Sequence, residues 1–157
     1  MALRRDIAEL VGKHYKKTTL PNNKCPVSGK VFGEEELING IEAVMKGWWT
    51  EGEYSTAFEN ELKKYVGADF ALTVNSGSSA NLVAFYALTS SKLGNRRIKR
   101  GDEVITAAAA FPTTVNPIIQ YGAVPVFLDV EPETYSIDFS SLEDALSPKT
   151  KAIFVAH

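Results

Sequence analysis

The sequence predicts an α/β fold in which strands alternate with helices, and the clearest evidence lies in its second half. Three short apolar segments read as strands: residues 103–106, 124–130 and 152–156. Helical patterns near residues 112–121 and 142–146 separate them. Strands and helices that alternate along a chain form parallel βαβ units with right-handed crossovers, so we expect a parallel sheet covered by helices.

Two details refine this expectation. Residues 70–74 alternate apolar and polar side chains and run directly into an apolar helical pattern, so they predict a further strand followed by a helix. Pro112 suits the first turn of the helix at residues 112–121. Pro117 has no backbone N–H and should kink that helix or mark an earlier boundary.

The first half of the chain predicts an N-terminal arm at residues 1–33 and a helical segment at 34–68, which leaves 69–157 as an incomplete large domain. The first helix begins with acids at 34–36, and Trp48 closes its apolar face, so we expect Trp48 in the core. The second begins with a capping box at Thr56 and ends at Gly67.

Composition excludes several classes of protein. The 157 residues are 45% hydrophobic and carry a net charge of −2, which fits a globular domain and disfavours nucleic acid or membranes as partners. The N-terminus lacks the apolar core of a signal peptide, so we expect a cytoplasmic protein. A single cysteine, Cys25, excludes an internal disulfide, and we predict no metal site. The basic clusters at 13–17 and 96–100 read as solvated faces.

The turn at residues 75–81, with the sequence NSGSSAN, is the strongest functional signal. It places small residues at a helix N-terminus, where free N–H groups, hydroxyls and the helix dipole favour an anion such as phosphate. The same residues also suit an ordinary helix with a serine N-cap. The residues of this turn leave both interpretations open.

Four motifs together suggest a family: GWWTEG at residues 47–52, NSGSSAN at 75–81, GDEVIT at 101–106 and FPTTVNP at 111–117. The chain resembles the sugar aminotransferase family of fold-type-I pyridoxal phosphate (PLP) proteins from about residue 26 to residue 157. PVSGKV at residues 26–31 is similar to the same segment in the branch of nucleotide-sugar 3-dehydrases. The substrates of this branch include CDP-4-keto-6-deoxy-D-glucose. The resemblance implies part of a mixed, mostly parallel seven-stranded sheet.

The resemblance also implies a cofactor site, made by residues 69–157. Gly77, Ser78 and Ser79 would hold the phosphate of pyridoxamine 5'-phosphate (PMP) or PLP, in agreement with the helix-terminus interpretation. Phe111 matches the aromatic residue that stacks on the pyridine ring, although its position also suits a core aromatic.

A second set of residues is assigned to the substrate. Trp49 and Thr50 match a segment that lies near the sugar or the neighbouring subunit, and contact with the substrate and burial against that subunit remain alternatives. No catalytic residue is assigned, because the family places its acid and its base after the strand that ends at His157.

The implied function is removal of the C3 hydroxyl from a nucleotide-linked 4-keto-6-deoxysugar in the synthesis of 3,6-dideoxysugars and lipopolysaccharide. A PLP-dependent nucleotide-sugar aminotransferase is the alternative. A lysine at the absent base position would indicate the aminotransferase, and a histidine would indicate the 3-dehydrase. The complete enzyme would be a homodimer served by a separate reductase. The nucleotide, the sugar configuration and an iron–sulfur cluster stay open.

A third alternative is a noncatalytic fragment or binding module. The chain stops directly after an apolar strand, which predicts truncation and an inactive fragment. In the family sheet, absent strands would separate residues 70–74 from the other three strands. A strand with two unpaired edges is unfavourable, so we expect that residues 1–157 alone do not form a stable domain.

Overall fold

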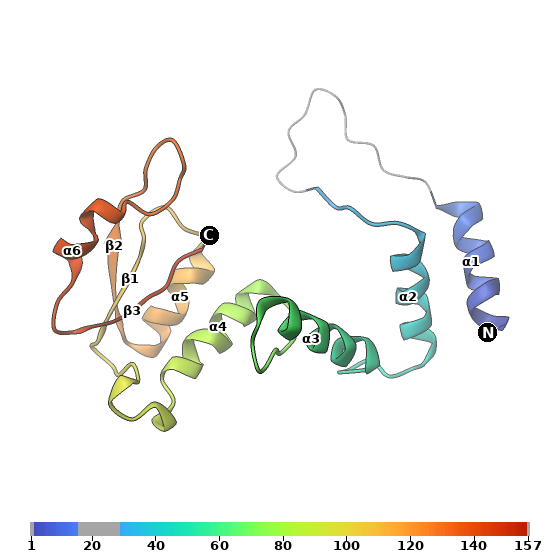
Figure 1. Cartoon of the computed structure of the whole chain (residues 1–157), viewed down its shortest axis with the longest axis horizontal. Coiled ribbons are helices and arrows are strands. Elements are labelled where there is room, and N and C mark those ends of the chain that lie inside the picture. The colour runs from blue at the N-terminus through green and yellow to red at the C-terminus, as the bar shows by residue number, and fades with distance from the viewer. Residues whose placement is uncertain (1, 16–28, 157) are drawn as a thin grey trace. The chain divides into compact units, whose positions relative to one another are not determined.

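The structure is a computed structural model that describes residues 2–15 and 29–156. The chain divides into two compact units, Met1–Leu72 and Thr73–His157 (Figure 1). Residues 1 and 16–28 of the expected arm, which include Cys25 and the first part of the 26–31 motif, lie outside the described residues. None of the described helices combines the length and the apolar composition that crossing a bilayer requires.

The first unit contains α1 (Ala2–His14), α2 (Glu34–Met45) and α3 (Glu53–Val66). Helices α1 and α2 pack through a small apolar cluster of Ile7, Val11 and Ile38. At the edge of this contact, Arg4 of α1 donates to Asn39 and forms ion pairs with Glu35 and Glu42, all on α2. The part of the expected arm that is described therefore includes a helix docked on its neighbour.

The expectation that Trp48 lies in the core is wrong. Helix α2 ends at Met45, and Gly47 follows with a φ of +68°, a left-handed conformation that ends a helix readily. Trp48 therefore leaves the helical face and is 69% exposed, and its indole N–H donates to the carbonyl of Glu51 at 2.6 Å. On the apolar face of α2, only Ile38 is buried.

Helix α3 starts earlier than the capping-box pattern predicts. It begins at Glu53 with Gly52 as N-cap, so Thr56 lies inside the helix and its hydroxyl donates to the carbonyl of Gly52 at 3.4 Å. The predicted end is confirmed, because Gly67 adopts a left-handed conformation with a φ of +69°.

The second unit is built on a three-stranded parallel sheet in the order β2-β1-β3, which confirms the predicted α/β class. The strands are β1 (Glu103–Ala107), β2 (Val124–Leu128) and β3 (Thr150–Ile153). Strand β2 is shorter than predicted because Val130 instead forms an isolated antiparallel bridge with Ile137. Strand β3 begins two residues earlier than predicted and ends at Ile153.

Helical segments cover both faces of this sheet (Figure 1). They are α4 (Gly77–Leu88), α5 (Pro112–Tyr121), α6 (Leu142–Ala145) and two 3₁₀ segments, η1 (Ser91–Arg96) and η2 (Phe139–Ser141). Val104 of β1 packs with Phe85 of α4 and Ile118 of α5 on one face, whereas Ile105 packs toward α6 on the other. Alternate residues of one strand thus serve two cores.

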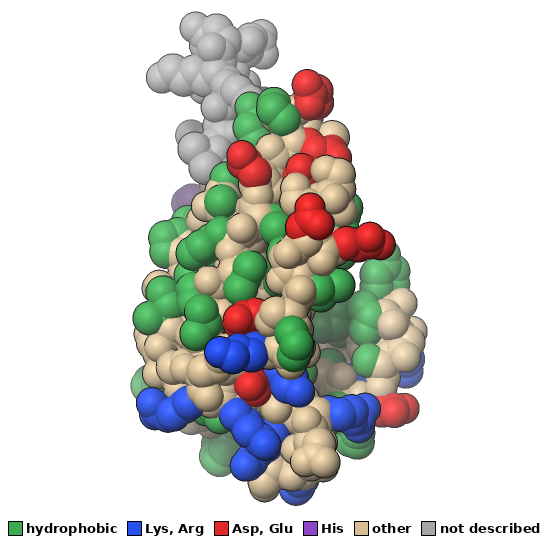
Figure 2. Space-filling view, turned by 90° about the vertical axis from the view of Figure 1, so that its left-hand side faces the viewer, with side chains coloured by type: hydrophobic (Ala, Val, Ile, Leu, Met, Phe, Trp, Pro, Cys, Tyr) green, Lys and Arg blue, Asp and Glu red, His purple; other side chains and the backbone are tan. Residues whose placement is uncertain are grey.

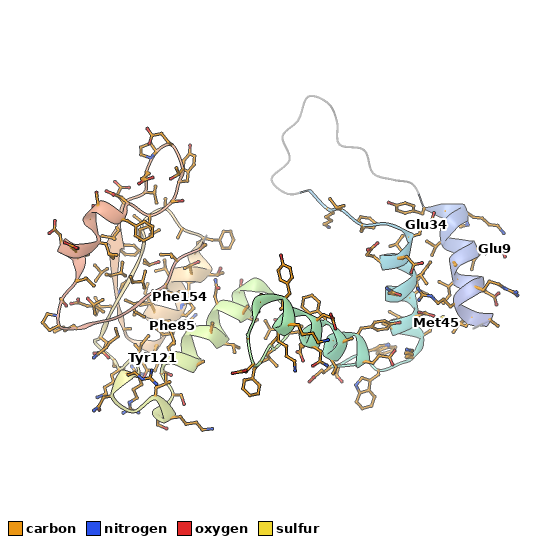
Figure 3. All side chains as sticks on the ribbon, viewed as in Figure 1. Glu9, Glu34, Met45, Phe85, Tyr121 and Phe154 are labelled. Atoms are coloured by element: carbon orange, nitrogen blue, oxygen red, sulfur yellow. The ribbon has the colours of Figure 1, made fainter. Side chains whose placement is uncertain are left out.

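Aromatic rings close the larger core. Phe85 makes edge-to-face contacts with Tyr121 and with Phe154, with ring centroids 6.1 and 5.9 Å apart, and Figure 3 shows the three side chains gathered between α4, α5 and the end of β3. These contacts fix α4 against the sheet from its C-terminal half.

The predicted strand at residues 70–74 does not form. No strand is found at these residues, and Phe70 is 89% exposed. The described sheet has no strand placed to pair with this segment, since its members are β2, β1 and β3 alone. Residues 70–74 therefore have no neighbouring strand in this sheet, and an alternating pattern without a pairing partner does not form a strand.

Native-state hydrogen exchange on the 157-residue chain tests this difference. Even in a chain that forms no stable domain, we expect the amides of the central strand β1 to be the best protected, because it is bonded on both sides. The amides of Phe70 and Leu72 should exchange close to their intrinsic rates. Protection of these two amides comparable to that of Val104, in a sample shown to be monomeric, would contradict the structure.

Candidate functional site

Helix α4 begins at the turn that the sequence singles out. Ser76 is its N-cap, with extended backbone angles, and its hydroxyl oxygen accepts the N–H of Ser79 at 3.2 Å. The predicted serine cap is therefore present. The N–H groups of Gly77 and Ser78 have no hydrogen-bond partner within residues 2–15 and 29–156, which leaves two donors of the first helical turn available.

The two serines of the turn have different surroundings. Ser79 is half-buried, and its hydroxyl donates to the side-chain oxygen of Asn75 at 2.6 Å. Ser78 is exposed, and no part of the described chain forms a hydrogen bond with its hydroxyl. Ser79 is thus tied into the turn, whereas Ser78 is free to donate to a ligand.

The space beside Gly77 is open. A Cβ atom placed on this glycine would meet no atom within 4 Å, and its φ lies outside the left-handed region. Glycine is therefore not required here by backbone strain. Its small size leaves room for another group to approach the exposed N–H groups closely.

A shallow groove of about 180 Å³ runs from this turn along the contact between α4 and α5. It is lined by uncharged residues, and although most of these are polar, the greater part of the exposed lining surface is apolar: Ser78, Ser79, Leu82, Thr113, Asn116, Pro117 and Gln120. The first turns of both helices contribute to one end of it. Helix α5 follows the C-terminal end of β1, so this end of the groove lies at the edge of the sheet where ligands of open α/β folds bind.

Phe111 precedes this groove as the N-cap residue of α5. Its side chain is 74% exposed, so the alternative that it is a core aromatic is wrong for this structure. The ring is available to a flat ligand, and Thr113, two residues later, lines the groove beside Ser78.

Residues 32–157 match the DegT/DnrJ/EryC1/StrS aminotransferase family over most of the chain. The chain belongs to this family. The lipopolysaccharide biosynthesis protein RfbH of Salmonella typhimurium is 50% identical over 161 residues, which cover 99% of this chain and 37% of that protein. The dTDP-4-dehydro-2,6-dideoxy-D-glucose 3-dehydratase of Saccharopolyspora spinosa is 46% identical, with 83% of this chain and 28% of that protein covered.

A solved member of the family has the same fold over this region. The crystal structure of GDP-4-keto-6-deoxymannose-3-dehydratase with a trapped PLP-glutamate geminal diamine matches with a TM-score of 0.73 at 36% identity, covering 83% of this chain and 33% of that one. The chain spans about a third of the length of these relatives. The predicted family and fold are therefore confirmed for the N-terminal part of such proteins.

The expected substrate residues of this family member, Trp49 and Thr50, lie in the first unit and are both exposed. The indole N–H of Trp49 donates to the carbonyl of Val44 at 3.1 Å, which fixes one edge of the ring while the side chain stays 80% exposed. Contact with a sugar and burial against a neighbouring subunit both remain compatible with this exposure.

Charge is separated across the second unit, and Figure 2 shows acidic and basic side chains gathered at different ends of one face. Residues 129–144, which follow β2, carry six acids and no lysine or arginine. Residues 92–100, which precede β1, carry five cations. These cations lie before the strand, at the edge away from the turn, so they form no part of the groove. No cluster of three metal-ligating side chains occurs in the described part of the chain.

Sequence reasoning assigned no role to most residues that line the groove, nor to Asn81, which lies behind it and joins its two helices. Asn81 belongs to the motif at 75–81, but the helical pattern gives it no role. In the structure its side-chain amide donates to the backbone carbonyl of Thr113 at 3.3 Å, which joins α4 to α5. Pro117 was the available signal, since a proline inside a helix removes the N–H that would bond to the carbonyl four residues earlier.

The residues of the groove fit the phosphorylated pyridine cofactors named for solved relatives in the family. The turn offers neutral donors at a helix N-terminus, open space beside Gly77 and a free hydroxyl on Ser78. An exposed ring at Phe111 precedes the facing helix. Since none of these groups titrates near neutral pH, their ability to bind an anion depends on geometry rather than on a protonation state.

Proposed function

We propose that the complete protein is a 3-dehydratase that removes the C3 hydroxyl from a nucleotide-linked 4-keto-6-deoxysugar with PMP as its cofactor. The observation that carries this proposal is the pairing of a free-donor turn on α4 with an exposed aromatic ring at the start of α5. Relatives named as 3-dehydratases at 46% and 36% identity support the reaction. The similarity to RfbH supports a place in lipopolysaccharide biosynthesis.

In this proposal the first turn of α4 binds the phosphate. The N–H groups of Gly77 and Ser78 and the hydroxyl of Ser78 donate to its oxygens, and the helix dipole favours the dianion. The N–H of Ser79 also points from this turn, and it is shared between the phosphate and the oxygen of Ser76 that it contacts at 3.2 Å.

Phe111 orients the other end of the cofactor by stacking on the pyridine ring, and it excludes water from that face. When bound, the cofactor supplies the electron sink that cleavage of the C3–O bond requires. Trp49 and Thr50 contact the sugar in the assembled enzyme. The assembled enzyme is a cytoplasmic homodimer with a separate reductase, as the family resemblance implies.

An aminotransferase acting on a similar sugar is the second candidate, because the matching family is described as an aminotransferase family and the same turn would serve PLP equally well. A noncatalytic cofactor-binding protein is the third. The three candidates differ in which part of the sugar reacts: the oxygen on C3, the keto group at C4, or neither.

Isotope exchange in the complete protein separates these candidates. With PMP and a nucleotide-linked 4-keto-6-deoxysugar in ¹⁸O-labelled water, we expect label to enter at C3, because reversible cleavage of the C–O bond exchanges that oxygen. An aminotransferase would instead place nitrogen on the sugar when supplied with glutamate and leave the C3 oxygen unlabelled. Neither change, in protein that binds PMP, would indicate a binding module.

The phosphate turn is tested by Ser78→Ala in the complete protein. Loss of a hydrogen bond to a charged group should weaken PMP binding by about 1–3 kcal/mol, with little effect on folding since this hydroxyl has no partner elsewhere in the described chain. Equilibrium dialysis measures the affinity. Ser90→Ala is the control for loss of a serine hydroxyl outside the groove; because Ser90 caps η1 by accepting the N–H of Lys92, this variant should cost stability and leave PMP affinity unchanged. Unchanged affinity in Ser78→Ala would count against the site.

The ring contact is tested by Phe111→Ala. Since the side chain is exposed, thermal stability should change little, whereas turnover should fall through loss of stacking and of ring orientation. Melting curves and steady-state kinetics on the same preparation provide the comparison. A large loss of melting temperature with normal turnover in the folded fraction would show that Phe111 is structural.

A further inference from the structure

Pro117 leaves one carbonyl of α5 without its usual partner. In an α-helix the N–H of residue i donates to the carbonyl of residue i−4, and proline has no N–H to give. The carbonyl affected here is that of Thr113. Helix α5 nevertheless continues through Pro117, which is buried, so the alternative that this proline marks an earlier boundary is wrong.

The neighbouring helix supplies the replacement donor. Asn81 of α4 donates its side-chain amide to the carbonyl of Thr113 at 3.3 Å, and both residues are half-buried. A carbonyl that is partly withdrawn from water and has no donor is costly, so this bond compensates for the proline. The bond also joins two elements, which an N–H within α5 would not do.

The position of this bond relates it to the groove. Asn81 lies three residues after Ser78 and so follows it on the same side of α4. Thr113 lies two residues after Phe111. The amide of Asn81 thus connects the helical turn that carries the free donors with the helical turn that follows the exposed ring.

We propose that Asn81 is a positioning residue that fixes the phosphate turn of α4 relative to Phe111, and that Pro117 reserves the carbonyl of Thr113 for this purpose. The proposal rests on the cofactor site described under the proposed function. A ligand held at two points gains affinity only when the two contacts are at the correct separation. Asn81 therefore matters to a ligand that spans both contacts and not to a ligand that uses one.

The experiment measures three affinities in the complete protein. PMP uses both contacts, pyridoxamine uses only the ring, and inorganic phosphate uses only the turn. In Asn81→Ala we expect PMP binding to weaken about three- to tenfold, the range that loss of one net hydrogen bond allows. The affinities for pyridoxamine and for inorganic phosphate should stay at their wild-type values. Asn81→Leu, which keeps a side chain of similar size but has no amide to donate, is the second variant if alanine prevents folding.

A matched control removes a similar bond at the other end of α5. The hydroxyl of Tyr121 donates to the carbonyl of Ile98 at 3.2 Å, away from the groove. Tyr121→Phe should cost comparable stability and leave all three affinities unchanged.

The Pro117→Ala background separates positioning from simple stabilisation. Alanine at this position restores an N–H that bonds to the carbonyl of Thr113, so the stability lost through Asn81→Ala should shrink in this background. The loss of PMP affinity should persist, because the connection between the helices is still absent. Denaturant unfolding gives the first quantity and equilibrium dialysis the second.

Each other result overturns the proposal. Equal PMP affinity in wild type and Asn81→Ala, a parallel fall for all three ligands, or full recovery of PMP affinity in the Pro117→Ala background would each show that Asn81 does not set the separation. Failure of the wild-type protein to bind PMP would refute the proposed function itself, and with it the role of Asn81. The unfolding cycle would then still report whether the bond to Thr113 stabilises the fold.

Discussion

The second unit depends on the burial of strand β1 between two layers. Four of its five residues are buried, and it is hydrogen-bonded to a parallel neighbour on each side. A parallel sheet needs cover on both faces, because its strands carry apolar side chains on both. Helices α4 and α5 meet this need on one face and α6 with the loop before it on the other. Because α5 runs back from the C-terminal end of β1, its first turn must lie at that edge, and the bond from Asn81 brings the first turn of α4 to the same place.

The groove is thus a consequence of layer packing more than of any single motif. Its donors are backbone N–H groups and a hydroxyl, which are available because helix ends lack internal partners. Ser76 and Asn75 satisfy part of this turn, and the remaining groups at Gly77 and Ser78 face open space. The charged residues of the unit lie elsewhere. The proposed affinity for a phosphate dianion therefore comes from oriented neutral dipoles, which need no counter-charge to be desolvated.

Local signals in the sequence predicted the elements that local physics determines. The helix Pro112–Tyr121, the left-handed end at Gly67 and the core of β1 follow from proline, glycine and apolar patterning alone. Elements that depend on distant partners were predicted less well. Residues 70–74 have the pattern of a strand but no neighbour to pair with, and Trp48 has the spacing of a core residue but lies beyond a helix that ends at Met45. Within the groove, the turn at Ser78 could be predicted from the sequence. The contact from Asn81 could not, because it depends on which helix lies beside α5.

The open edges of the sheet have a consequence for how this chain behaves in solution. In the described chain, β2 and β3 each pair with β1 on one side only, so each presents a row of unsatisfied N–H and C=O groups on the other. Phe127 of β2 and Ile153 of β3 are about half exposed along these rows. Short parallel edges with apolar side chains are templates for strand addition, and any extended segment of suitable pattern can continue the sheet. The same property makes association between copies concentration-dependent, so dilution would favour the monomeric form. Pairing of the edges with a segment of the same molecule would favour it too.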